Sequence, residues 1–335
     1  MAMMDKPKNQ HLTTAQKTLS ARLFDILLSQ EGILAIILVL TIIILSFTND
    51  NFLTRDNLFN QGRLMTEIGL MAIPMTFIII TGGIDLSVGS MLGLSAIMIG
   101  YSWENLGLPL GIAIAVGILV ASLAGFLNGL LIVRVKVPPL IMTLATLAFY
   151  RGLAQGISEA RSVTGYPEWF FGLGQGNILG VPTQLWILGI SIIISIIVLQ
   201  RTTLGRTLYA IGNNEVAARF SGLSVDRTLL IIYTFSGLMA GISGAIFVSR
   251  FTTTRSDMGS GLELDAIAAV VLGGTSIFGG KGTIIGTVLG LIMIQVLKNG
   301  LGMNGVTGDA TIVVIGIVLI LAILVNNLIQ RLRQR

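Results

Sequence analysis

The chain has 335 residues, of which 53% are hydrophobic and only 11% are charged, and its mean hydropathy is +0.87. Soluble domains carry about 25% charged residues, so this composition indicates a membrane-embedded protein, in which the excess of 21 basic over 16 acidic residues reflects cytoplasmic loops rather than nucleic-acid binding. With no cysteine and a single histidine, His11, disulfides, thiol chemistry, a zinc site and histidine-based catalysis are not expected.

The N-terminal segment 1–31 is polar and charged. It has no apolar core followed by a small-residue cleavage site, so no cleaved signal peptide is predicted. Within it, the stretch 18–30 has apolar residues at near-helical spacing, which fits either an amphipathic helix on the membrane surface or a short cytoplasmic lead-in helix. We expect residues 1–31 and the basic segment 329–335 to be cytoplasmic tails of a membrane domain that covers 32–328.

About ten segments approach the 20 apolar residues that a membrane-spanning helix needs. They are 32–48, 65–81, 86–100, 109–133, 139–157, 184–200, 229–249, 263–279, 283–299 and 309–328. We therefore predict an all-α, polytopic integral membrane protein with about ten transmembrane helices. The second and third segments, and the eighth and ninth, are short and joined by glycine-rich stretches, which leaves the count open by one or two.

The distribution of basic residues orients these spans. With both termini in the cytoplasm, the inner segments hold 14 lysines and arginines and the outer segments hold 7, which agrees with the positive-inside rule. The largest connections are then an outer loop at 158–183 and an inner loop at 201–228. Neither is large enough to form a separate enzymatic domain.

One glycine-rich segment occurs twice. GGIDLSVGSMLGL at 82–94 aligns without gaps on GGKGTIIGTVLGL at 279–291. Paired short spans interrupted by glycine, at corresponding positions of two halves, are typical of a transport site. The Gly-x-x-x-Gly spacing that begins at Gly89 in the first copy, and recurs in the second, also suits close helix packing. The two interpretations are compatible.

Asp85 is the charged residue of the first copy. A charge inside a bilayer costs about 2.5–3.5 kcal/mol on insertion scales, so this carboxylate should face a cavity, a helix end or water. It either caps the helix that follows, lines a polar pathway for a hydroxylated substrate, or couples transport to protons. Asn128 is an amide that either hydrogen-bonds between helices or holds a substrate hydroxyl. The candidate pathway residues are Gly82, Gly83, Asp85, Ser87 and Asn128.

No sequence motif indicates catalysis. GGTSIFGGKGT at 273–283 is reminiscent of a phosphate-binding loop, but G-x-x-x-x-G-K-[ST] requires glycine where Thr275 lies and a hydroxyl where Gly282 lies. Zinc-protease and serine-hydrolase signatures are also missing. We therefore expect no catalytic residue, no bound cofactor and no metal site in this chain.

The loop after the sixth candidate span has the signals of a short helix. Glu215 and Arg219 form an i,i+4 pair in the favourable order. Asn213 or Asn214 can cap a helix that begins near Glu215, and Gly222 can end it. A capped helix on the cytoplasmic face suits docking to a partner, and a plain surface loop is the alternative.

Three blocks carry a family resemblance: GGIDLSVGS (82–90), LYAIGNNEVAARFSGLSV (208–225) and ELDAIAAVVLGGTSIFGGKGTIIGT (263–287). They resemble the membrane permease subunits of bacterial ATP-binding cassette (ABC) importers for monosaccharides, and the resemblance runs from about residue 32 to 325. It implies a dimer of permeases in the inner membrane, two cytoplasmic ATPase chains that bind ATP and Mg²⁺, and a periplasmic protein that delivers the sugar. This chain is then a transport subunit in contact with membrane lipid, and not an enzyme.

The resemblance also implies that the loop over 205–225 couples the permease to a groove on the ATPase. The residues given this role are Gly205, Arg206, Gly212, Asn213, Glu215, Ala218, Arg219 and Gly222. The chain reads AIGNNE where AIGGNE or ALGGNE is expected. Asparagine tolerates positive φ better than most residues, so Asn213 should be accepted in place of glycine.

The substrate is less defined. SVTGYPEW (162–169) and TTTRSDMGSG (252–261) resemble rhamnose and autoinducer-2 permeases more than ribose permeases. Two different permease chains often pair in that branch, so both a homodimer and a heterodimer stay open. The main alternative is an ion-coupled secondary sugar transporter, which predicts transport by this chain alone and an essential intramembrane carboxylate, with Asp85 as the candidate.

Overall fold

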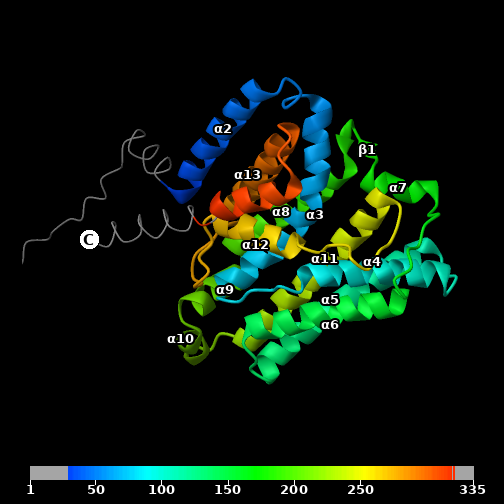
Figure 1. Cartoon of the computed structure of the whole chain (residues 1–335). Coiled ribbons are helices and arrows are strands. Elements are labelled where there is room, and N and C mark those ends of the chain that lie inside the picture. The colour runs from blue at the N-terminus through cyan, green and yellow to red at the C-terminus, as the bar shows by residue number, and fades with distance from the viewer. Residues whose placement is uncertain (1–28, 319, 321–335) are drawn as a thin grey trace, which may run out of the picture.

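A computed structural model describes residues 29–318 and residue 320 (Figure 1). Its regular structure is helical apart from one short antiparallel hairpin, formed by β1 (Asn177–Ile178) and β2 (Val181–Pro182). The all-α prediction is therefore confirmed for this part of the chain. The tail 1–28 and the basic segment 329–335 lie outside the described residues, as does most of the amphipathic stretch.

Seven of the described helices are long and apolar enough to cross a membrane. They are α2 (Gln30–Thr48), α3 (Arg55–Ile80), α5 (Leu110–Arg134), α6 (Pro139–Ser158), α8 (Thr183–Arg201), α11 (Val225–Phe251) and α13 (Ile284–Met303). A further apolar helix covers Gly308–Val318. The chain is thus a polytopic membrane protein, whereas these lengths do not confirm the count of about ten spans.

Two further apolar helices, α4 (Val88–Glu104) and α12 (Leu262–Leu272), are shorter. With 11 residues, α12 is about 16 Å long, roughly half the thickness of the hydrocarbon core. The structure differs here from the predicted span 263–279, because the chain leaves the helix at Gly273 and turns at Gly274, whose φ is +93°. The remaining short helices are α7 (Glu168–Gly174), α9 (Thr203–Asn213) and α10 (Glu215–Phe220).

Helix α3 forms the centre of the bundle. Every residue from Thr66 to Ile80 is buried, and the helix packs against α8, α11, α12 and α13. A helix that is buried on all faces is surrounded by protein rather than by lipid. Helix α2, in contrast, exposes large apolar side chains such as Ile44 and Phe47, as expected at a lipid-facing surface.

The glycines of α4 bring the loop 252–261 close to that helix. A Cβ atom on Gly89 would lie 2.5 Å from the carbonyl oxygen of Gly259, and one on Gly93 would lie 2.7 Å from that of Met258. In the second copy of the repeat, the corresponding glycines of α13 pack against α12. The small-residue spacing therefore serves close packing, and in the first copy its neighbour is a loop rather than a helix.

Candidate functional site

Helix α10 is a short capped helix at one end of the bundle (Figure 1). Oδ1 of Asn214 accepts a hydrogen bond from the N–H of Ala217 at 2.9 Å, so Asn214 and not Asn213 is the cap. Gly222, with φ of +78°, turns the chain after the helix, and the N–H of Leu223 returns to the carbonyl of Ala218 at 3.1 Å. The helix predicted from the cap signals is confirmed.

One ion pair joins α10 to the start of α11, and a second lies within α10 itself. The guanidinium of Arg219 lies 2.9 Å from Glu215 and 2.6 Å from Asp226. Hydrogen bonds to Glu215 and then to Asp226 raise the pKa of Arg219 above its ordinary value. Exposed ion pairs contribute little to global stability, so their effect here is to hold a short helix in one orientation.

The outward face of α10 is apolar. Phe220 is 89% exposed and Val216 is 63% exposed, whereas Ala218 is buried in a small cluster with Ile211 and Val225. An exposed aromatic side chain beside a second apolar one is typical of a protein-binding surface. The sequence interpretation missed Phe220 and Val216. Their i,i+4 spacing, on the helix face opposite Ala218, could have indicated an apolar exposed face. We call Val216, Glu215, Arg219 and Phe220 the α10 surface.

Helix α9 connects the α10 surface to the bundle interior. A Cβ atom on Gly212 would lie 1.8 Å from the carbonyl oxygen of Ile80 and 2.4 Å from the backbone nitrogen of Gly280. The hydroxyl of Tyr209 donates a 2.6 Å hydrogen bond to the carbonyl of Gly282. The C-terminal half of α9 therefore rests directly on the last residue of α3 and on the second copy of the glycine repeat.

The other residues predicted in this loop have different surroundings. Gly205 is buried, where a Cβ atom would lie 2.0 Å from the carbonyl oxygen of Leu199, so it allows the tight turn from α8 into α9. Arg206 is exposed on α9. Asn213 does not adopt positive φ, so its tolerance of that conformation is not needed. Its Oδ1 atom instead lies close to Gly280.

The two copies of the repeat share the backbone conformation of their first glycine, and the last residue of α3 contacts the second copy. Gly82 and Gly279 occupy corresponding positions and have φ of +82° and +86°. The helices that follow, α4 and α13, begin at corresponding positions to within one residue. The N–H of Gly280 donates a 2.9 Å hydrogen bond to the carbonyl of Ile80. We call the segments 80–87 and 273–283 the glycine joints, the first of which begins at the last residue of α3.

Asp85 lies fully buried in the first glycine joint. Its Oδ1 accepts hydrogen bonds from the N–H of Ser87 at 3.0 Å and from the Ser87 hydroxyl at 2.6 Å. Its Oδ2 accepts a 2.8 Å bond from the hydroxyl of Ser236 on α11. Within the described residues Asp85 makes no ion pair, so hydroxyl and amide donors alone surround this carboxyl group.

These contacts extend into a network across three helices. Asn128 on α5 donates from Nδ2 to the Ser87 hydroxyl at 2.8 Å, and the hydroxyl of Tyr150 on α6 donates to Oδ1 of Asn128 at 3.0 Å. We call Asp85, Ser87, Asn128, Tyr150 and Ser236 the Asp85 network. The sequence interpretation grouped the first three correctly but missed Tyr150 and Ser236, since only the fold brings those residues near.

The interpretation of Asp85 as a cap of α4 needs correction. Asp85 binds the N–H of Ser87, which precedes the first helical residue, and Ser87 itself makes no side-chain cap bond at the start of α4. The carboxylate therefore stabilises the backbone of the joint and does not accept a hydrogen bond from the free N–H groups at the start of the helix. Gly82 and Gly83 lie in the same joint, where a Cβ atom on Gly83 would lie 2.7 Å from the hydroxyl of Tyr233. A pathway role for these residues stays a prediction.

Comparison with known proteins decides the family. A sequence model described as the permease component of a branched-chain amino acid transport system matches residues 57–323. The chain belongs to this permease family. The resemblance to permease subunits of ABC importers is thereby confirmed.

Two curated relatives of the permease are ribose import permease proteins, both called RbsC. The one from Bacillus subtilis (strain 168) is 40% identical over 322 residues, covering 96% of this chain and 98% of the relative. The one from Escherichia coli (strain K12) is 38% identical over 308 residues, covering 90% and 94%.

A third relative of the permease is the autoinducer 2 import system permease protein LsrD of Yersinia enterocolitica serotype O:8. It is 36% identical over 299 residues, covering 88% of this chain and 90% of the relative. A further RbsC, from Haemophilus influenzae, is 34% identical to this chain. The identity to LsrD therefore lies between those to different RbsC proteins, so sequence identity alone does not distinguish the two substrates. The comparison with solved structures gave no significant match.

Proposed function

We propose that the permease forms the translocation pathway of an ATP-driven importer for a monosaccharide or a sugar-like furanose of the ribose, rhamnose or autoinducer-2 class. It lies in the bacterial inner membrane with both termini in the cytoplasm. The ribose and autoinducer-2 classes are proposed because two relatives are named as import permeases for ribose and for autoinducer 2. The observation that carries the proposal is the α10 surface, in which exposed Val216 and Phe220 lie on the same short helix as an ion pair and which α9 connects to both glycine joints.

The implied partners have separate tasks. Two cytoplasmic ATPase chains bind ATP and Mg²⁺, and this chain holds no cofactor of its own. A second permease chain, identical or different, completes the membrane part, and a periplasmic binding protein delivers the sugar. The α10 surface fits a groove on the ATPase, with Phe220 as the apolar anchor and Arg219 and Glu215 at its polar rim.

We infer about ten membrane-embedded helices. The seven long helices, together with α4, α12 and the helix that begins at Gly308, make ten apolar elements. With α9 and α10 in the cytoplasm, basic residues are twice as frequent on the inner side as on the outer side. The N-terminal tail and the basic C-terminal tail then both lie in the cytoplasm.

The contacts suggest how ATP energy reaches the pathway. A shift of α10, caused by the nucleotide state of the ATPase, moves α9, and Gly212 passes that movement to Ile80 and Gly280. The first joint continues into the Asp85 network, which holds α5, α6 and α11 together. Small movements at one end of a packed element produce discrete rearrangements because packed interiors are not continuously deformable.

Reconstitution into proteoliposomes tests this proposal. The chain is reconstituted alone, and then with its ATPase, second permease chain and binding protein, and is offered labelled ribose, rhamnose and autoinducer 2. We expect uptake only with all components and ATP, and the preferred label identifies the substrate. Uptake by the chain alone, driven by an ion gradient and indifferent to ATP, would instead establish the secondary-transporter alternative.

A further inference from the structure

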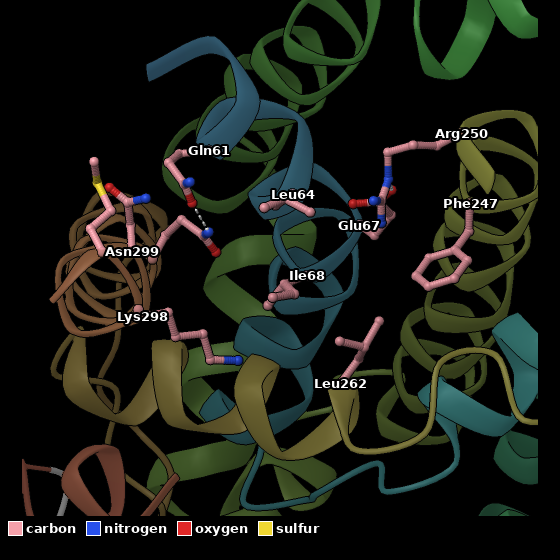
Figure 2. A pocket seen from close by; sticks show the side chains of 12 residues that line it. Gln61, Leu64, Glu67, Ile68, Phe247, Arg250, Leu262, Lys298 and Asn299 are labelled. Atoms are coloured by element: carbon pink, nitrogen blue, oxygen red, sulfur yellow. Dashed lines mark hydrogen bonds and ion pairs between the residues drawn. The ribbon is translucent and has the colours of Figure 1, made fainter. Parts of the chain in front are cut away.

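A cavity of about 510 Å³ lies between α3, α11, α12 and α13 (Figure 2), at the end of the bundle away from α10 (Figure 1). It is formed by the first turns of α3 and α12 and by the last turns of α11 and α13. Its volume falls within the range of about 300–1,000 Å³ that is typical of small-molecule sites. None of the residues that line it is among the candidate pathway residues predicted from the sequence.

Polar side chains face this cavity in pairs that join its walls. Nε of Arg250 on α11 donates to Oε1 of Glu67 on α3 at 2.8 Å. Gln295 on α13 donates to the side-chain oxygen of Gln61 on α3, the dashed contact in Figure 2. At the floor, Lys298 on α13 pairs with Asp265 of α12 at 2.6 Å. Each wall thus offers hydrogen-bonding groups at the cavity surface.

Glu67 has one oxygen without a partner. The residue is 1% exposed, and its Oε2 accepts no hydrogen bond from the described residues, although the carboxylate lines the cavity. A buried carboxylate oxygen without a donor is costly. Because Oε2 is itself buried, a ligand hydroxyl supplies the missing donor when the Glu67 side chain turns toward the cavity.

The α11 wall also has an apolar, aromatic part. Phe247 lines the cavity on α11, and the guanidinium of Arg250 lies 5.1 Å from its ring centre and 4.2 Å from that of Phe251. Figure 2 shows the Phe247 ring on the α11 side with Leu262 below it. A flat apolar surface beside hydrogen-bonding groups suits a molecule that carries both hydroxyls and C–H faces.

The charges at the cavity favour a neutral ligand. Arg250 is matched by Glu67, and Lys298 is matched by Asp265, so no cation remains free to bind a phosphate. A phosphorylated ligand would have to break one of these pairs, and leaving a buried charge without its partner is strongly unfavourable.

We propose that this cavity binds a neutral, polyhydroxylated molecule of monosaccharide size, with Glu67 and Gln295 as hydrogen-bonding side chains and Phe247 as the apolar wall. The inference rests on the proposed import function, in which the cavity receives the substrate on the outer side. Helix α12 then separates the cavity from the second glycine joint, since its first turn forms the cavity floor and its last turn ends at Gly273.

Thiol protection gives a direct test, because the chain has no cysteine and any introduced thiol is unique. Leu64→Cys places a thiol in the cavity wall, and Asn177→Cys places an exposed thiol on β1, outside the cavity. The complex of permease and ATPase in nanodiscs is treated with a maleimide, with and without D-ribose or D-ribose 5-phosphate. We expect D-ribose to slow labelling of Leu64→Cys only, and the phosphate to protect neither position. Equal labelling of Leu64→Cys with and without every neutral sugar tested would overturn the proposal.

A second pair of variants tests the assigned contacts. In the Leu64→Cys background, Gln295→Met and the isosteric Glu67→Gln should each weaken protection by D-ribose about tenfold, since a hydrogen bond to a charged or buried group is lost. Gln155→Met, the same change at an exposed position of α6, should leave protection unchanged. Unaltered protection in both cavity variants would overturn the assignment even with ATP-driven uptake intact. Protection without any ATP-driven uptake would keep the cavity and contradict the import function.

Discussion

The N–H of Gly280 donates a hydrogen bond to the carbonyl oxygen of Ile80, 2.9 Å away, and so joins the last residue of α3 to the second copy of the glycine repeat. Gly212 of α9 packs against both of these residues. One small helix at the surface therefore contacts both interrupted spans at the same point. This arrangement connects the α10 surface to the segment that holds Asp85, in addition to α11, which pairs with α10 at Asp226 and carries Ser236.

Gly212→Ala tests that connection. The new methyl group would lie 1.8 Å from the Ile80 carbonyl oxygen and would push α9 away from both joints. We expect ATP hydrolysis to continue while sugar uptake falls by about 5-fold or more, the range of typical coupling free energies. Uptake per ATP hydrolysed, measured in proteoliposomes, checks this. Gly189→Ala on α8, where a Cβ atom meets nothing within 4 Å, serves as the control and should behave as wild type.

Asp85→Ala tests the network. The change leaves the hydroxyls of Ser87 and Ser236 without their acceptor inside the protein, at a cost of about 1–3 kcal/mol for each unsatisfied group. We expect a lower unfolding temperature of the purified chain and a loss of uptake. Ser122→Ala, which removes a hydroxyl bonded only within its own helix, should change neither quantity.

Asp85→Asn separates charge from hydrogen bonding. The amide keeps the shape of the carboxyl group and one acceptor oxygen. We therefore expect an unfolding temperature between those of the wild type and Asp85→Ala, and reduced uptake. Unchanged assembly together with unchanged uptake would rule out a required charge at this position. Uptake that loses its dependence on a proton gradient would favour the secondary transporter.

Glu215→Arg tests the polar rim of the α10 surface. The variant places a cation beside Arg219, leaves only Asp226 to hold that guanidinium, and releases α10 from its fixed orientation. We expect ATP hydrolysis stimulated by the binding protein to fall several-fold. Glu215→Gln removes only an exposed ion pair, worth about 0.2–1 kcal/mol, and should retain most of the stimulation. Normal stimulation in both variants, with normal uptake, would contradict the coupling role.

Local signals made part of the structure predictable from the sequence. Asn214 and Gly222 define the ends of α10 because cap preferences act over three or four residues. The repeat could be recognised in the sequence because positive φ at Gly82 and Gly279 favours glycine at both positions. These features depend only on residues close together in the chain.

Long-range features were not predictable in the same way. Ser236 reaches Asp85 across 151 positions, and Tyr150 reaches Asn128 between neighbouring helices, so only the packed bundle identifies them as partners. The apolar stretch 263–279 was predicted to be one span because hydropathy contains no information on backbone conformation. In the structure α12 ends at Leu272 and Gly274 has positive φ. Likewise, Glu67 reads as a residue near a span end until α11 brings Arg250 beside it.

Docking of the α10 surface on the ATPase is the central claim, and copurification of the ATPase with the permease measures it most directly. Phe220 and Leu179 are both 89% exposed, but Leu179 lies in the β1–β2 hairpin, away from α10. We expect Phe220→Asp to abolish copurification, Phe220→Leu to retain most of it, and Leu179→Asp to leave it unchanged. Full copurification of the ATPase with Phe220→Asp would contradict the claim that α10 is the surface through which ATP energy enters.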